Sequence, residues 1–170
     1  MSSTKNNIIL DFNYTASTRL ILKQCGLSDE DIDNRLIKVH GEASNNDIIF
    51  GVEDNAGIKK EHVFLRKAYN IKYKALNFSE LYDRIKSVAI FGHSLGETDH
   101  TYFNKLFQES CMYNKFSTNN NKEFWLFYYK ENGYHCMMQQ LDSLTHNSLT
   151  SFRQYNRVNF INTDKEKVFI

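Results

Sequence analysis

The chain has 170 residues, a length that suits one domain over residues 1–170 and that can bury a core without disulfides or metals. Hydrophobic residues make up 41% of the chain and aromatic residues 14%, which excludes an intrinsically disordered protein. The formal net charge of +1 gives no global field for nucleic acid or an anionic membrane, so we expect neither as a partner.

Strand-like and helix-like patterns alternate along the first half of the chain. Short apolar runs that end in polar residues or glycine predict strands. Apolar residues spaced three or four apart predict helices, which begin at capping residues and stop at glycine. In chain order the patterns predict a strand over 7–13, a helix over 16–25 stopped by Gly26, one turn from Ser28 to Asp33, a strand over 35–41, a polar turn over 42–46, a strand over 47–52 and a helix over 59–77.

The second half continues this alternation. The apolar residues of 87–91 are consecutive, which is typical of a strand covered on both faces. The remaining predicted elements are a helix over 79–86 capped by Ser79, a helix capped by Thr98 or Asp99 that carries Tyr102, Phe103, Leu106 and Phe107, a surface loop over 117–122, a strand over 123–130, helices over 134–145 and 149–155, and a strand over 158–161.

Alternating strands and helices indicate an α/β fold with a Rossmann-like, mostly parallel sheet and helices on both faces. In such sheets ligands bind beyond the carboxyl ends of the strands. Three predicted strands end in polar or glycine-bearing segments, at 13–15, 40–41 and 92–94. If the three strands are parallel neighbours, these segments meet at one edge of the sheet.

The cysteines and the N-terminus indicate a cytoplasmic protein. Cys25, Cys111 and Cys136 are odd in number and far apart, which argues against a disulfide framework and against a zinc site. Reduced thiols are typical of a cytosol. The first residues lack the apolar run of a signal peptide, and no stretch approaches the length of a membrane span.

Residues 92–96, Gly-His-Ser-Leu-Gly, match the G-x-S-x-G pattern of a nucleophile elbow. A nucleophilic Ser94 needs a histidine base and an acid. In the required order only Asp142 and His146 could supply them, and their spacing of four puts both near one helix end. The alternative is a tight strand-to-helix turn, in which the glycines relieve crowding and Ser94 makes a local hydrogen bond.

The same turn also carries His93, Glu97, Asp99 and His100. Two histidines and two carboxylates could bind a metal, but their spacing follows no zinc pattern, so we expect no metal. Asp99 is more simply interpreted as a helix N-cap or as a partner for a sugar hydroxyl.

Two further residues at strand ends allow both a structural and a functional interpretation. His40 could be a hydrogen-bonded loop histidine, or a general base, since histidine exchanges protons near neutral pH. Asn13 could form a turn, or its amide could orient a ribose or a water molecule.

Segments 12–15 (Phe-Asn-Tyr-Thr), 39–41 (Val-His-Gly) and 91–99 (Phe-Gly-His-Ser-Leu-Gly-Glu-Thr-Asp) together resemble, in this order, the second half of the AbiH family. These are bacterial abortive-infection proteins of phage defence. The strand-like segment 48–51 lies between them as in that family. The order is also similar to sirtuin-like (SIR2-like) proteins, in which comparable segments line an NAD site.

The resemblance implies a role for each matching residue. Asn13 corresponds to a catalytic asparagine, and His40 to the catalytic histidine that activates the nicotinamide ribose. The remaining implied contacts bind the cofactor NAD, with Asp99 near its adenosine end. They are Thr15, Gly41, Gly92, His93, Ser94 and Asp99.

The chain departs from these families in two ways. Thr15 stands where the sirtuin pattern has an aspartate, and neither the Gly-Asn-Gly-Phe-Asp opening of AbiH proteins nor a glycine-rich phosphate loop is present. We therefore expect the C-terminal portion of such a protein, without its first strand and glycine-rich turn.

The resemblance implies an antiviral hydrolase that binds or cleaves NAD or a related nucleotide. A phage-derived trigger or self-association would be its further partners. The alternatives are a non-enzymatic interaction or sensing module, an inactive fragment, and a serine hydrolase that uses Ser94.

Overall fold

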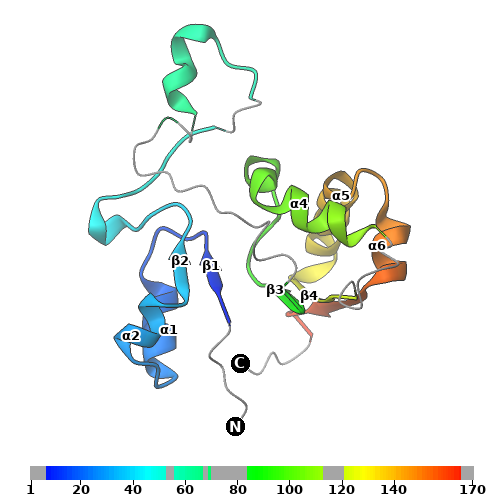
Figure 1. The fold of residues 1–170 in the computed structure, drawn as a ribbon, viewed down its shortest axis with the longest axis horizontal. Coiled ribbons are helices and arrows are strands. Elements are labelled where there is room, and N and C mark those ends of the chain that lie inside the picture. Colours follow the sequence, from blue (N-terminus) through cyan, green and yellow to red (C-terminus); the bar gives the residue numbers. More distant parts are fainter. Residues whose placement is uncertain (1–6, 53–55, 67–68, 70–83, 113–120, 166–170) are drawn as a thin grey trace. The chain divides into compact units, whose positions relative to one another are not determined.

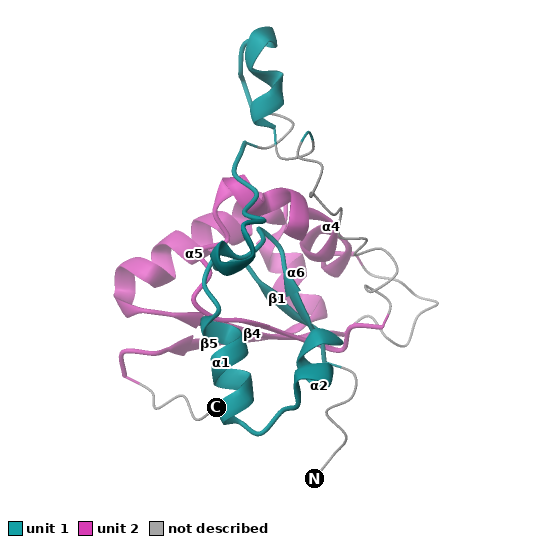
Figure 2. Cartoon of the chain, turned by 90° about the vertical axis from the view of Figure 1, so that its left-hand side faces the viewer, with its two compact units in different colours: residues 1–75 teal, residues 76–170 magenta. Residues whose placement is uncertain are grey.

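The computed structural model describes residues 7–52, 56–66, 69, 84–112 and 121–165. The chain divides into two compact units, residues 1–75 and residues 76–170 (Figure 2). Each unit is built around its own parallel sheet. The α/β class with parallel sheets is therefore confirmed, whereas the expectation of one domain stays a prediction.

Unit 1 contains a two-stranded parallel sheet (Figure 1). Strand β1 pairs with β2 so that Leu10 lies opposite Ile37. Helix α2 contacts both α1 and β2, and its Ile32 is fully buried. The elements of unit 1 are β1 (Ile9–Asp11), α1 (Ser17–Gln24), α2 (Asp29–Asp33), β2 (Leu36–Lys38) and the 3-10 helices η2 (Ala43–Asn45) and η3 (Lys60–Leu65).

The helix ends of unit 1 follow the sequence signals. Gly26 has a φ of +86°, the left-handed conformation that commonly ends a helix, directly after α1 and its C-cap Cys25. The Ser28 hydroxyl accepts a hydrogen bond of 3.1 Å from the Asp31 amide, so it caps α2 as predicted. Arg19 of α1 forms ion pairs with Asp29 and Asp33.

Two predictions for unit 1 are wrong. Residues 47–52 form no strand. Within the described part of the chain, their β-type pairing is limited to an isolated bridge between Val52 and Arg66. The Ile49 amide instead bonds back to the His40 carbonyl. Of the helix predicted over 59–77, the described residues 59–66 form only the 3-10 helix η3, which ends where Arg66 turns extended (ψ 136°). Positions 67–68 and 70–77 of that prediction lie outside the described residues.

Unit 2 contains a three-stranded parallel sheet in the order β3-β4-β5. The register sets Ile90 opposite Leu126, and Tyr128 opposite Asn162. Helical segments connect the successive strands, as parallel pairing requires. The elements are β3 (Ser87–Ile90), the 3-10 helix η5 (Glu97–Asp99), α4 (His100–Ser110), β4 (Glu123–Tyr128), α5 (Lys130–Leu144), α6 (Leu149–Tyr155) and β5 (Arg157–Asn162).

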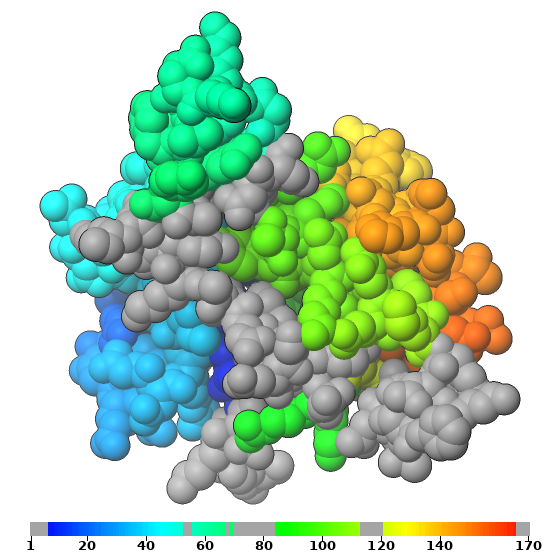
Figure 3. Space-filling view, turned by 45° about the horizontal axis from the view of Figure 1, so that its top comes forward, coloured from blue at the N-terminus to red at the C-terminus, as the bar shows by residue number. Residues whose placement is uncertain are grey.

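Helices α4, α5 and α6 lie on one side of the sheet of unit 2 (Figure 1). In the space-filling view their surfaces lie next to one another and are coloured from green to orange (Figure 3). The ring of Phe124 on β4 lies 5.6 Å from Phe107 of α4 and 4.8 Å from Phe152 of α6, measured between centroids. These three rings are fully buried. Ala89 of β3 points to the other face and is exposed, so the described residues of unit 2 cover only one face of this strand, and its predicted burial on both faces stays a prediction.

Three further expectations for unit 2 need correction. Helix α5 begins at Lys130, four residues earlier than predicted, and the Asp99 side chain makes no capping hydrogen bond to α4. Lys122 was expected in a surface loop, but it is buried, and its ammonium donates to the Ile85 carbonyl (2.9 Å). Residues 79–83 of the helix predicted to start at Ser79, and residues 117–120 of the loop, lie outside the described residues; Arg84–Lys86 are not helical.

In the described part of the chain, no helix combines the length and the apolar character needed to cross a membrane. All three cysteines are free: Cys25 and Cys136 are exposed and Cys111 is partly buried. Burial raises the pKa of the Cys111 thiol above its ordinary value. Its Sγ donates to the Phe107 carbonyl at 3.2 Å.

Candidate functional site

The first group of predicted site residues lies at one edge of unit 1. Because β1 and β2 are parallel, their carboxyl ends lie at the same edge. Asn13 follows β1 by two residues and His40 follows β2 by two residues. The two loops are joined directly, since the Ala43 amide donates to the Tyr14 carbonyl (2.8 Å). The structure thus brings Asn13, Thr15, His40 and Gly41 to one edge, which accounts for two of the three predicted segments; the third, 92–94, follows β3 in the other sheet.

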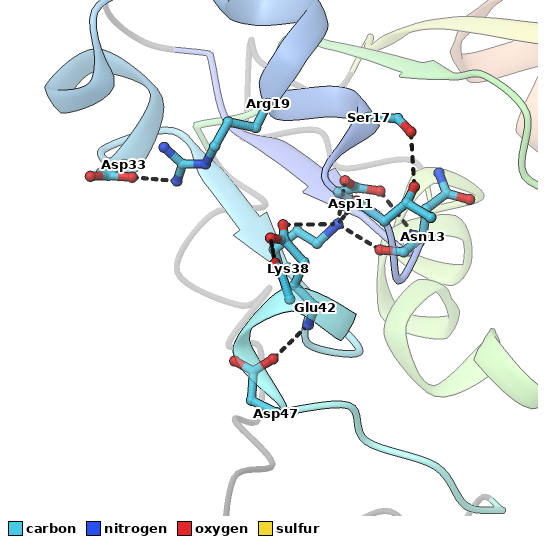
Figure 4. A network of polar contacts seen from close by, with 10 residues as sticks. Asp11, Asn13, Ser17, Arg19, Asp33, Lys38, Glu42 and Asp47 are labelled. Atoms are coloured by element: carbon cyan, nitrogen blue, oxygen red, sulfur yellow. Dashed lines mark hydrogen bonds and ion pairs between the residues drawn. The ribbon is translucent and has the colours of Figure 1, made fainter.

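Lys38, the last residue of β2, ties this edge together (Figure 4). Its ammonium donates to the carbonyl oxygens of Asn13 and Thr15, both at 2.6 Å. It also donates to Asp11 Oδ2 at 2.9 Å, and Glu42 Oε2 lies 3.7 Å away. Two carboxylates and two carbonyl oxygens therefore surround one cation, which fixes the loop after β1 to the end of β2.

The sequence analysis missed this role of Lys38. The available signal was a lysine two residues before His40 in a strand whose other residues are mostly apolar. The Lys38 side chain is 16% exposed and that of Asp11 only 2%. A charge this far from water needs a partner, so a lysine and an aspartate on neighbouring predicted strands could have been paired.

Asp11 remains ionised in this environment. Burial raises the pKa of its carboxyl. Hydrogen bonds from Lys38, from the Asn13 backbone amide and from Thr18, together with the charge of Lys38, lower the pKa by more than burial raises it. The net pKa lies below the ordinary value for an aspartate. The Asn13 amide bonds to Asp11 Oδ1 at 2.9 Å, so the same carboxylate orients the backbone on which Asn13 stands.

Gly41 permits the tight turn that follows His40. Its φ is +74°, and a Cβ at this position would lie 2.1 Å from the backbone oxygen of Asp47. The next amide, of Glu42, donates to Asp47 Oδ1 at 2.6 Å. Only glycine accommodates both the conformation and the close approach. This explains the strand end in His-Gly on which the sequence analysis relied.

His40 is buried, with an exposed fraction of 5%, among aromatic rings. Its ring centroid lies 5.5 Å from Phe12, in an edge-on arrangement, and 6.0 Å from Tyr14. Tyr14 in turn lies 5.5 Å from Phe50, whose side chain is 70% exposed. The buried imidazole therefore stands next to the exposed ring of Tyr14, which continues into that of Phe50, and a flat heterocycle can stack on these two rings.

The second group of predicted residues forms the turn after β3 in unit 2. Gly92 and Leu95 both have positive φ, +65° and +55°, and the Leu95 side chain is fully buried. The Leu95 amide donates to His93 Nδ1 at 2.9 Å, and His93 Nε2 lies 3.4 Å from Asp99 Oδ2. Asp99 therefore pairs with His93 instead of capping α4. The turn brings Gly92, His93, Ser94 and Asp99 together.

His100 connects this turn to α5. Its Nε2 lies 3.0 Å from the Leu95 carbonyl oxygen and 2.8 Å from Gln140 Oε1. Because both partners are acceptors, Nε2 carries the proton. His100 is thus engaged in holding the turn.

The geometry of unit 2 does not assemble a Ser-Asp-His triad. Ser94 is exposed and follows the carboxyl end of β3. Helix α5 starts at the carboxyl end of β4 and runs back along the sheet, so Asp142 in its last turn and His146 beyond it lie toward the opposite edge. His146 Nε2 bonds there to Gln108, near the end of α4 (3.0 Å).

Across the described ranges, no three histidine, cysteine, aspartate or glutamate side chains are grouped to hold a metal ion. The predicted site residues form two groups, one in each unit. That both groups serve one nucleotide stays a prediction.

Comparison with known proteins gives one match. The family model described as "Bacteriophage abortive infection AbiH" matches residues 1–129, which include both groups of site residues. No curated protein matches the chain. No solved structure matches it either. Since the family model covers well over half of the 170 residues, the chain belongs to the bacteriophage abortive infection AbiH family.

Proposed function

We propose that this AbiH protein acts in the cytoplasm on a sirtuin-like scaffold, where it binds NAD or a related nucleotide and hydrolyses its nicotinamide–ribose bond. The observation that carries the proposal is the buried His40 beside Asn13 at the carboxyl edge of β1 and β2. Parallel α/β sheets bind their ligands at such edges. The resemblance to sirtuin-like NAD sites includes these two residues.

In the proposed reaction, water attacks C1′ of the nicotinamide ribose. The electron pair of the breaking C–N bond goes to the ring nitrogen, so nicotinamide leaves as a neutral molecule. The proton of the attacking water passes to His40, and the products are ADP-ribose, nicotinamide and one proton. The Asn13 side-chain amide orients the ribose or the water.

The surroundings of His40 support this assignment. The rings of Tyr14 and Phe50 offer a stacking surface for nicotinamide next to the imidazole. Thr15 and Gly41 supply a hydroxyl and backbone groups at the same edge. Lys38 holds the loop that carries Asn13 and Thr15, which pre-organises the site before the ligand arrives.

The turn after β3 supplies further nucleotide contacts in this proposal. Apart from the two chain neighbours of Gly92, no atom of the described residues lies within 4 Å of the position that a side chain there would occupy, so a ligand can approach its backbone. Ser94 is exposed and can donate to a phosphate or ribose oxygen.

Calorimetric titration of the purified chain with NAD tests the binding step. We expect Asn13→Ala to weaken binding about tenfold, because one or two hydrogen bonds to the ribose are lost. The matched control is His62→Ala, which removes an exposed histidine of η3 and should bind as the wild type does. If the wild-type chain binds neither NAD nor a related dinucleotide, the proposal is wrong.

One observation favours a second candidate function, an interaction or sensing module. Phe91 is 61% exposed and lies 5.5 Å from Phe127, on the sheet face opposite α4–α6. Contiguous exposed apolar surface marks interaction sites, and Phe91 together with the partly exposed Phe127 forms an apolar surface on this face. A phage-derived trigger or a second copy of the chain could bind there. Light scattering of the wild type and of Phe91→Ser distinguishes self-association, which the serine would abolish, from a monomer.

A further inference from the structure

A pocket with a volume of about 430 Å³ opens at the carboxyl ends of β4 and β5. Its walls come from the end of β4, the first turns of α5 and the turn after β5. Small-molecule sites range from about 300 to about 1,000 Å³, so the pocket is large enough for a ligand. It lies in unit 2, and all its lining residues except Tyr128 follow residue 129, where the family match ends.

The aromatic wall of the pocket is held in place by its neighbours. The ring of Tyr134 lies 5.3 Å from that of Tyr128 and 5.4 Å from that of Phe160, edge-on. Thr163 fixes the opposite wall, because both its amide (2.9 Å) and its hydroxyl (3.0 Å) donate to the Tyr128 carbonyl. The pocket is therefore formed before any ligand binds.

The polar groups of the pocket are of two kinds. Lys130 and Lys165 bring positive charge from two different elements, the start of α5 and the turn after β5. The N-terminus of α5 has no side-chain cap, so its first amides add to the positive potential there. Glu131, Asp164 and Asn162 offer oxygen acceptors, and Asn162 Oδ1 already fixes the turn by accepting from the Asp164 amide (3.0 Å).

We propose that this pocket binds a nucleoside phosphate. The base lies against Tyr128 and Tyr134, since tyrosine rings stack on flat heterocycles. The phosphate pairs with Lys130 and Lys165, and the ribose hydroxyls donate to the carboxylates. A simple anion would leave the aromatic wall unused and face two carboxylates, whereas an apolar ligand would use neither lysine. The three kinds of group together match base, sugar and phosphate.

Calorimetric titration of the full chain with AMP, adenosine and inorganic phosphate tests this proposal. We expect AMP to bind more tightly than either component. The double variant Lys130→Gln/Lys165→Gln should weaken AMP binding about tenfold or more, because two charge-assisted contacts are lost. Lys59→Gln/Lys60→Gln removes the same charge from unit 1 and should bind AMP as the wild type does.

A second variant tests the contribution of the aromatic wall to binding. Tyr134→Leu retains an apolar side chain against Phe160 and should weaken adenosine and AMP alike, while the circular dichroism spectrum stays that of the wild type. The proposal is overturned if AMP does not bind, or if it binds the double lysine variant as tightly as the wild type.

The pocket proposal is independent of the proposed function. His40→Ala should leave AMP binding at this pocket unchanged, because His40 belongs to unit 1. A chain that binds AMP in this lysine-dependent manner but does not consume NAD would support the pocket and contradict the proposed reaction. A chain that consumes NAD but shows no lysine-dependent AMP binding would support the proposed reaction and contradict the pocket.

Discussion

At the scale of single residues, the ion pair of Lys38 with Asp11 determines how unit 1 presents its predicted site. The pair is nearly removed from water, and the lysine also binds the carbonyl oxygens of Asn13 and Thr15. A buried pair contributes little by its mere presence, but removing one partner leaves an uncompensated charge. The position of Asn13 therefore depends on a residue that makes no contact with a ligand in the proposed reaction.

Replacing Lys38 with methionine should lower the free energy of unfolding by about 3 kcal/mol, because the buried Asp11 carboxylate loses its cation. Urea denaturation measures the change. The control is the double variant Asp11→Asn/Lys38→Met, in which the more deeply buried of the two carboxylates around Lys38 is no longer charged. It should recover part of the loss; a double variant that is less stable than Lys38→Met alone would contradict the assignment.

The same pair makes stability depend on pH. Because the folded-state pKa of Asp11 lies below its unfolded value, the carboxylate stabilises the fold above the unfolded pKa, and this stabilisation is lost as the pH falls through the folded pKa. The free energy of unfolding should therefore decline below roughly pH 4. Unfolding curves across the acid range should show a shallower decline for Asp11→Asn/Lys38→Met. Equal slopes for the two proteins would show that Asp11 is not the group responsible.

At the scale of elements, most strands and helices could be predicted from local patterns. Helix α1 ends just before the predicted glycine, and α2 begins at the predicted serine cap. The bounds of α6 are those predicted. The failures have tertiary causes. The apolar periodicity of 59–66 gave only η3, in which Phe64 and Leu65 are exposed and so contribute no burial that would stabilise an α-helix. Residues 47–52 look like a strand but make a single bridge.

Some parts of the candidate site could be predicted from the sequence, and others could not. Local sequence identified the strand ends at Asn13, His40 and Gly92, because polar and glycine residues after apolar runs are visible without a structure. It could not identify Lys38, whose role depends on three acceptors that approach only when β1 and β2 pair. Nor could it show that Asp99 lies against His93, since a capping residue and a partner for a histidine look alike in sequence.

The core of unit 2 is built on one face of its sheet, so substitutions on the two faces should differ. Phe124→Ala removes a fully buried ring that contacts Phe107 and Phe152, and should cost about 3–5 kcal/mol of unfolding free energy. Phe127→Ala, on the other face of the same strand, is the matched control and should cost clearly less. Urea denaturation of both variants provides the comparison, and equal losses would mean that both faces are covered.

At the scale of the whole molecule, the chain consists of two compact units, whereas its length predicts one domain. The only tryptophan, Trp125, lies on β4 and reports the unfolding of unit 2 by its fluorescence. If the chain is one cooperative domain, Lys38→Met in unit 1 should lower the unfolding midpoint seen by Trp125. An unchanged midpoint, with a loss of stability seen only by circular dichroism, would show two separately folding units.

The most direct test of the proposed reaction is the release of nicotinamide from NAD by the purified chain, followed by chromatography. The wild type and His62→Ala should release nicotinamide and ADP-ribose in equal amounts. His40→Ala should reduce the rate about 100-fold or more, which is the usual contribution of a general base. Absence of release by the wild type, or a rate for His40→Ala equal to that of the wild type, would contradict the account.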